Sequence, residues 1–298
     1  MSTSTFIDPK DLRALANSKL RARTVVEGLL TGMHRNPHRG SSVEFSEYKE
    51  YVPGDELKYA DWRAFARVDR YYVKQFEDET HLRTYFLLDQ SGSMDFAFGE
   101  HTLTKYDYGA TLCAAMSWLM LRQGDAPGLM LFDDQVRAFV PTSTRKNQLD
   151  DLCTMLDEAN IRGKTDLEEA LSRAAERMKR RGMIVLISDF IDVGDEALLL
   201  ARMLRRRGMD VVCFHVMDRA EWTLPWEQMC RFEGMEDAGE ELVEPDEIRS
   251  AYQREVRAHI TRIEDACAQG DIEYFHVFTD ESPADAIRAL IQRRTRRR

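Results

Sequence analysis

The chain has 298 residues, of which 43% are hydrophobic and 32% are charged, a composition typical of a globular protein with one or two domains. Its formal net charge of −10 disfavours a general nucleic-acid-binding function, which requires a basic surface. No stretch approaches the roughly 20 apolar residues that span a bilayer, and the N-terminal residues lack the apolar core of a signal peptide. We therefore predict a cytoplasmic protein without a transmembrane segment.

The first 81 residues are predicted to form a smaller N-terminal α+β module. Asp8 followed by Pro9 is typical of a helix start, and apolar residues continue at roughly helical spacing as far as Gly32. The run RYYVKQFE, residues 70–77, alternates as a strand does. We place the domain boundary between residues 81 and 82.

From Leu82 onwards, short apolar runs alternate with helical patterns. Strands are expected at residues 84–89, 128–133, 135–140, 183–189, 210–216 and 272–278, with the second and third forming a hairpin. Helices are expected at 106–122, 147–160, 166–181, 195–207, 248–269 and 282–293. This alternation predicts an α/β fold for residues 82–298: a doubly wound, mostly parallel sheet covered on both faces.

Residues 218–247 form an acidic insertion in this pattern, with eleven Asp or Glu residues against two Arg. It also contains Trp222, Leu224, Trp226 and Phe232. Two interpretations stay open: a solvated insertion that packs through its aromatic residues, or a docking surface for a basic partner. The basic end RRTRRR, from Arg293, is interpreted as a solvated terminus in preference to a contact with nucleic acid or a membrane. The five cysteines form no CxxC pair and are predicted to be reduced, mostly buried thiols.

Three predicted loops place hydroxyl and carboxylate oxygens at one edge of the sheet. Asp89, Ser91 and Ser93 directly follow one buried strand, another strand ends with Asp189, and Thr165 precedes a helix. Ligands collect beyond the carboxyl ends of the strands in such sheets, and these oxygens suit Mg²⁺, Mn²⁺ or Ca²⁺. The alternative is a polar strand end in which Asp89 and Ser91 act only as caps.

DQSGS resembles the DxSxS motif of the metal-ion-dependent adhesion site in von Willebrand factor A domains. GKTDL resembles the second motif of that site, with Thr165 as the threonine, and LISDF resembles the third, with Asp189 as the aspartate. The resemblance implies that Ser91, Ser93 and Thr165 bind the metal directly, whereas Asp89 and Asp189 act largely through water. It further implies that another protein supplies a carboxylate as the last ligand.

The upstream stretch EFSEYKEYVPGDELKYADWRAFARVD is similar to the signature of the domain of unknown function 58 family. The matching residues are Tyr51, Pro53, Gly54, Asp55, Asp61, Trp62, Ala66 and Arg67. Members of this family often accompany MoxR-type AAA+ ATPases. The resemblance therefore implies a metal-dependent adaptor or co-chaperone that helps such an ATPase in the maturation of client proteins. Many relatives carry membrane helices, which this sequence lacks.

A metal-dependent hydrolase, acting for example on phosphoesters, is the alternative from another class of protein. Such an enzyme needs a general base or nucleophile beside its metal, and no histidine occurs in the three loops. The sequence also lacks a P-loop and a GxSxG motif. His34 and His38 are interpreted as loop histidines in preference to a zinc pair, and Asp55, Asp61 and Arg67 as a structural ion-pair cluster. We predict that the protein is not an enzyme.

Overall fold

The computed structural model describes residues 9–33, 48–50, 72–74, 82–99, 102–177, 182–235 and 239–297. The chain divides into two compact units, one of residues 35–81 and the other of residues 1–34 together with 82–298. In the smaller unit, β1 (Tyr48–Glu50) pairs antiparallel with β2 (Tyr72–Lys74). The signature residues between 51 and 67, with the predicted ion-pair cluster, lie outside the described residues, as do His34 and His38.

The larger unit is built on a six-stranded sheet with the order β10-β7-β6-β3-β4-β5. Its strands are β3 (Arg83–Asp89), β4 (Ala126–Phe132), β5 (Val136–Val140), β6 (Met183–Ser188), β7 (Asp210–Met217) and β10 (Glu273–Phe278). All neighbouring strands are parallel except the β4–β5 hairpin. The chain starts in the middle at β3, builds to one edge, and then returns to add β6, β7 and β10 on the other side. The predicted doubly wound fold class is therefore confirmed.

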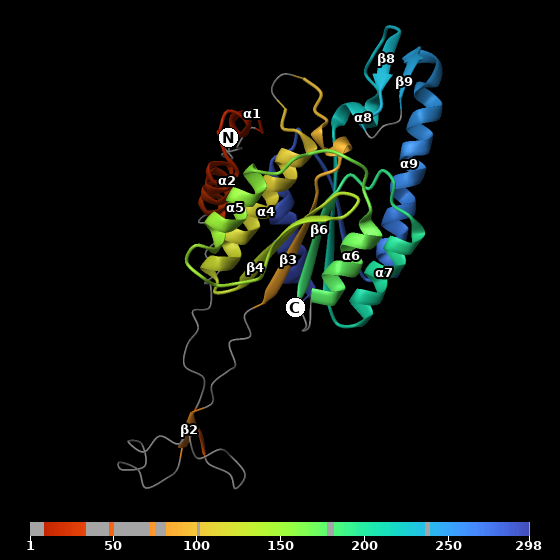
Figure 1. The fold of residues 1–298 in the computed structure, drawn as a ribbon. Coiled ribbons are helices and arrows are strands. Elements are labelled where there is room, and N and C mark those ends of the chain that lie inside the picture. The colour runs from red at the N-terminus through yellow and green to blue at the C-terminus, as the bar shows by residue number, and fades with distance from the viewer. Residues whose placement is uncertain are drawn as a thin grey trace. The chain divides into compact units, whose positions relative to one another are not determined.

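Helices cover both faces of this sheet (Figure 1). One face is covered by α4 (Lys105–Arg122), α5 (Gln148–Asp157) and α10 (Pro283–Arg297), with α2 (Ser18–Met33) packed on α4. The other face is covered by α6 (Leu167–Arg177), α7 (Asp195–Arg206) and α9 (Pro245–Gln269). Successive side chains of β3 alternate between the two cores, with Phe86 and Leu88 in the first and Tyr85 and Leu87 in the second. Burial on both faces explains why the strands read as continuous apolar runs.

The N-terminal helical segment belongs to the larger unit, which corrects the predicted 1–81 module. It forms two helices, α1 (Pro9–Arg13) and α2, and Leu12, Val25 and Leu29 are buried in the same core as α4. Arg21 also forms an ion pair with Asp107 of α4, with 2.5 Å between Nη1 and Oδ1. Helical spacing shows that one face of a helix is buried, but not which distant segment covers it. Only residues 35–81 form the separate unit.

The acidic insertion has its own secondary structure, which the sequence did not predict. It contains α8 (Arg219–Thr223) and an antiparallel hairpin of β8 (Cys230–Glu233) and β9 (Glu240–Val243). The following helix, α9, begins at Pro245, three residues before the predicted start. All five cysteines are free, and four of them are buried, as the sequence predicted. None of the described helices is long and apolar enough to cross a membrane.

Candidate metal site

The predicted site lies where the two central strands β3 and β6 end side by side. These strands pair in parallel, with Leu88 opposite Ile187, so that Asp89 and Ser188 follow at the same edge. The chain builds outwards in opposite directions from β3 and β6. The place between their carboxyl ends is therefore the topological switch point, where doubly wound folds bind ligands.

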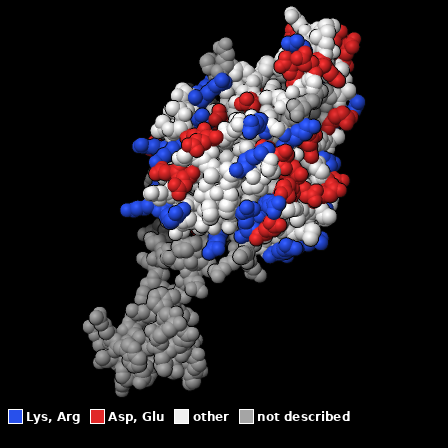
Figure 2. Space-filling view, in the orientation of Figure 1, with Lys and Arg blue, Asp and Glu red and all other residues white. Residues whose placement is uncertain are grey.

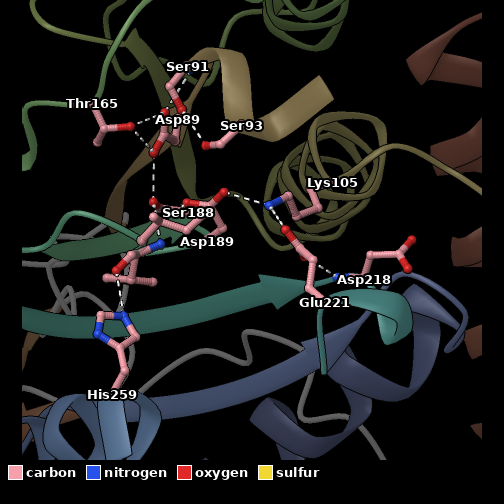
Figure 3. Close-up of polar contacts among 12 residues, drawn as sticks. Asp89, Ser91, Ser93, Lys105, Thr165, Ser188, Asp189, Asp218, Glu221 and His259 are labelled. Carbon is pink, nitrogen blue, oxygen red and sulfur yellow. Dashed lines mark hydrogen bonds and ion pairs between the residues drawn. The ribbon is translucent and has the colours of Figure 1, made fainter. Parts of the chain in front are cut away.

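Asp89 is at the centre of the hydrogen bonds that join the three predicted loops (Figure 3). Its Oδ1 accepts the backbone N–H of Ser91 at 2.9 Å. Its Oδ2 accepts the hydroxyl of Ser188 at 2.7 Å and that of Thr165 at 3.1 Å. One carboxylate thus contacts the DxSxS loop, the Thr165 loop and the end of β6. The Asp89 side chain is completely buried.

The two serines of the motif lie together at the start of the short 3₁₀ helix η2 (Gly92–Asp95). The Oγ atoms of Ser91 and Ser93 are 3.1 Å apart. Ser93 lies close enough to Asp189, which follows β6, for its hydroxyl to favour the charged form of that carboxylate and lower its pKa. The side chains of all five predicted ligand residues are therefore brought together by these contacts.

The Thr165 loop is held against the DxSxS loop by main-chain hydrogen bonds. The N–H of Gly92 donates to the carbonyl of Gly163 at 2.9 Å, and the N–H of Arg162 donates to the carbonyl of Gln90 at 2.9 Å. Gly163 has a φ of 82°, in the left-handed region that favours glycine. This turn brings the Thr165 hydroxyl to Asp89.

The two carboxylates of the site differ in their electrostatic surroundings. Burial raises the pKa of Asp89 to about 7, and the nearby charge of Asp189 adds to the rise, although hydrogen bonds from Ser188 and Ser91 oppose it. Burial also acts to raise the pKa of Asp189, but the charge and hydrogen bond of Lys105, with hydrogen bonds from Ser93 and Ile191, bring it below its usual value. The charged form of Asp89 is therefore the destabilised one, and a cation at the site would relieve it.

Lys105, the first residue of α4, is a component of the site that sequence reasoning missed. Its side chain is completely buried, and its Nζ donates to Asp189 Oδ2 at 2.7 Å and to Glu221 Oε1 at 2.5 Å. Burial acts to lower the pKa of Lys105, but the charges of Asp189 and Glu221 raise it above the usual value. The ammonium thus stays charged and offsets part of the negative charge beside the predicted ligands.

Three weak signals in the sequence mark the missed residues. Lys105 stands in the first turn of a helix, where the helix dipole disfavours a cation unless a carboxylate faces it. Ser188 is the one polar residue of the buried strand β6. Glu221 is three residues after Asp218, which is the spacing of a capping box. None of these signals shows that Lys105 pairs with Glu221 or that Ser188 donates to Asp89.

The donor set fits a hard divalent cation. It consists of hydroxyl and carboxylate oxygens, which suit Mg²⁺, Mn²⁺ or Ca²⁺. Within the part of the chain that the structure describes, no three His, Cys, Asp or Glu side chains are arranged to hold an ion. A metal at the switch point therefore depends on the hydroxyl groups of Ser91, Ser93 and Thr165 in addition to the two aspartates.

Fold and site together define an α/β domain with an oxygen-lined site at the switch point of its sheet. The chain matches the model of the family described as "Protein of unknown function DUF58" over residues 47–262, and it belongs to this family. The family predicted from the sequence signature is thus confirmed. The chain is 32% identical over 189 residues to the uncharacterized proteins Rv1480 of Mycobacterium tuberculosis and Mb1516 of Mycobacterium bovis. The matches cover 62% of this chain and 58% of each relative, so the chain spans little more than half of their length.

Two solved structures match this chain at low sequence identity. The conserved hypothetical protein BatB from Bacteroides thetaiotaomicron is 15% identical, with a TM-score of 0.48, over 72% of this chain and 99% of that chain. The SpRpn10 VWA domain is 12% identical, with a TM-score of 0.44, over 70% of this chain and 94% of that chain.

Proposed function

We propose that this protein is a metal-dependent protein-binding adaptor that works with a MoxR-type AAA+ ATPase in the maturation of client proteins. The observation that carries the proposal is the convergence of five oxygen-bearing residues at the switch point: Asp89, Ser91, Ser93, Thr165 and Asp189. The ion that best fits these donors is Mg²⁺, with Mn²⁺ and Ca²⁺ as chemically similar alternatives.

The donor set supports protein binding because it leaves the ion incompletely neutralised. In the family pattern, the hydroxyls of Ser91, Ser93 and Thr165 are direct ligands, and Asp89 and Asp189 hold water. Mg²⁺ requires six oxygens, so this set leaves one position for a carboxylate from another protein. Lys105 already pairs with Asp189, which reduces the negative charge available to the ion. A partner carboxylate is therefore attracted to the site, and the attraction weakens with salt.

We propose a MoxR-type ATPase as the partner because members of the family that this chain resembles often accompany such ATPases. We also propose that the protein is not an enzyme, because the three loops contain no histidine that could act as a base. Four buried free thiols support a reducing, cytoplasmic location.

Calorimetric titration with MgCl₂ and MnCl₂ tests the metal site. We expect the wild type and a control variant, Ser250→Ala on the exposed side of α9, to bind one ion with equal affinity. Ser93→Ala is expected to lose about tenfold or more in affinity, because it removes a direct ligand. Absence of binding by the wild type, or equal binding by all three proteins, would contradict the proposal.

A pull-down with a MoxR-type ATPase and its client tests the partner. Recovery is expected with wild type and Ser250→Ala in Mg²⁺, and loss is expected with Ser93→Ala or a chelator. Equal recovery in all conditions would place binding elsewhere on the chain.

Metal-dependent phosphoester hydrolysis that disappears in Ser91→Ala would instead support the hydrolase alternative.

A further inference from the structure

The segment that follows the DxSxS motif is covered by the insertion between β7 and α9. Of the acidic insertion, residues 218–247, the structure describes 218–235 and 239–247, and the last three residues begin α9. In Figure 1 its hairpin stands at the same edge of the sheet as the predicted site. The insertion contacts the segment from Gly92 to Lys105 at three separate places.

The first contact is between the turn of the hairpin and the motif itself. A Cβ atom added at Gly92 would lie 2.3 Å from the carbonyl oxygen of Met235, a distance that no side chain tolerates. The main chain of the insertion therefore lies directly against the residue between Ser91 and Ser93. These serines are 0% and 7% exposed, so a large ligand has little access to them in this arrangement.

The second contact joins Phe98 to the root of the hairpin. The Phe98 ring meets the Trp226 ring edge-to-face at 5.1 Å, and Trp226 meets Phe232 of β8 in the same way at 5.3 Å. The backbone N–H of Phe98 donates to Asp218 Oδ2 at 3.1 Å. The loop after the motif is thus attached to the insertion through both an aromatic contact and a hydrogen bond.

The third contact is the buried ion pair of Lys105. Glu221 accepts Lys105 Nζ on Oε1 and the backbone N–H of Asp218 on Oε2, at 2.8 Å. It therefore closes the capping box of α8 and binds the ammonium that pairs with Asp189 (Figure 3). A single side chain connects a predicted metal ligand to the first helix of the insertion.

The insertion is anchored by hydrogen bonds near Leu224 and Trp226, whereas its hairpin of β8 and β9 buries few apolar side chains. Arg249 of α9 donates to the carbonyl oxygens of Leu224 and Trp226, at 3.0 and 2.6 Å. On the hairpin, Leu242 is 69% exposed. Acidic side chains gather at this end of the molecule (Figure 2). A segment with an anchored root and few buried apolar contacts opens at a lower free energy than the sheet beneath it.

We propose that the insertion is a cap on the predicted metal site, and that Lys105 is the positioning residue through which the cap and Asp189 influence each other. An ion at the site attracts the carboxylate of Asp189 and so weakens its ion pair with Lys105. The ion pair between Lys105 and Glu221 then becomes stronger and stabilises the position of α8. A partner carboxylate reaches the ion only when the turn at Met235 moves off Gly92. The coupling to metal rests on the proposed function, whereas the cap itself does not require metal.

Hydrogen–deuterium exchange on the full chain tests the cap without metal. The variant is Glu221→Gln, and the control is Glu241→Gln, which removes the same charge from an exposed position on β9. Glu221→Gln is expected to speed exchange of α8 and the hairpin about tenfold, the effect of losing one charged hydrogen bond. Exchange of β3 and β6 should stay unchanged and report an intact fold. Equal exchange in Glu221→Gln and Glu241→Gln would overturn the role of Lys105.

Addition of MgCl₂ to the same samples tests the coupling, with calorimetry run in parallel. In the wild type and Glu241→Gln, metal is expected to slow exchange of α8 and the hairpin. Glu221→Gln should bind metal but show no such slowing. Metal binding that leaves the exchange of the wild-type insertion unchanged would overturn the coupling. A wild type that binds no metal would instead refute the proposed function, and the metal-free comparison would still decide whether Lys105 holds the cap.

Discussion

Replacing Lys105 with methionine tests how much the buried ammonium contributes to the stability of the domain. The side chain is 0% exposed, and its partners Asp189 and Glu221 are 3% and 19% exposed. Removal of one member of a buried ion pair costs about 3–5 kcal/mol, because the remaining charge stays buried without a counter-charge. Here two carboxylates lose their partner, so we expect a loss in this range. That is a large part of the roughly 5–15 kcal/mol that stabilises a typical domain.

Urea unfolding of the full chain, followed by circular dichroism in the presence of a chelator, measures this loss. The control is Lys146→Met, which changes an exposed lysine in the same way. A double variant that combines Lys105→Met with Glu221→Gln should recover at least about 1 kcal/mol, because one of the two unpaired charges is gone. A free energy of unfolding for Lys105→Met within about 1 kcal/mol of the Lys146→Met value would refute this reasoning.

Three further predictions concern Gly92, Asp89 and the buried residue His215. Gly92→Ala should displace the hairpin at Met235 and destabilise its packing against the DxSxS motif by about 1–3 kcal/mol. The measurement is the rate of proteolysis within the insertion, which should rise. An unchanged rate would contradict the contact between Met235 and Gly92. Asp89→Asn should remove the rise in melting temperature that Mg²⁺ produces in the wild type, and a retained rise would exclude Asp89 from the site. The pKa of buried His215 is lowered to about 3 from 6.5, chiefly by burial, so its neutral form is the one that favours folding. The stability that this group contributes is complete above pH 6.5 and falls by about 2 kcal/mol between pH 7 and pH 5. In His215→Phe, the free energy of unfolding should no longer show this fall. An unchanged pH dependence of unfolding in the variant would contradict the prediction.

Much of the site could be predicted because its residues follow regular elements. A central parallel strand must be apolar on both faces, so β3 and β6 are recognisable as short apolar runs. Polar residues directly after such strands must lie at the carboxyl edge of the sheet, whatever the rest of the chain does. This is why Asp89, Ser91, Ser93 and Asp189 could be grouped before their contacts were known. Thr165 precedes α6 and follows no strand, so it joined the group through its resemblance to the second motif. Binding of metal by this group stays a prediction.

The sequence by itself thus determined the strands of the six-stranded sheet and the helices that cover it, the fold class, the family and the five clustered residues, since each depends on local periodicity or on a contiguous motif. The tertiary structure alone decided that Lys105 pairs with Asp189 and Glu221, which are 84 and 116 residues away, and that the insertion lies against Gly92. It also decided that α2 packs on α4 and belongs to the larger unit, and not to the unit of residues 35–81. The physical reason is that buried charges and apolar faces require partners, but local sequence does not specify which distant segment supplies them.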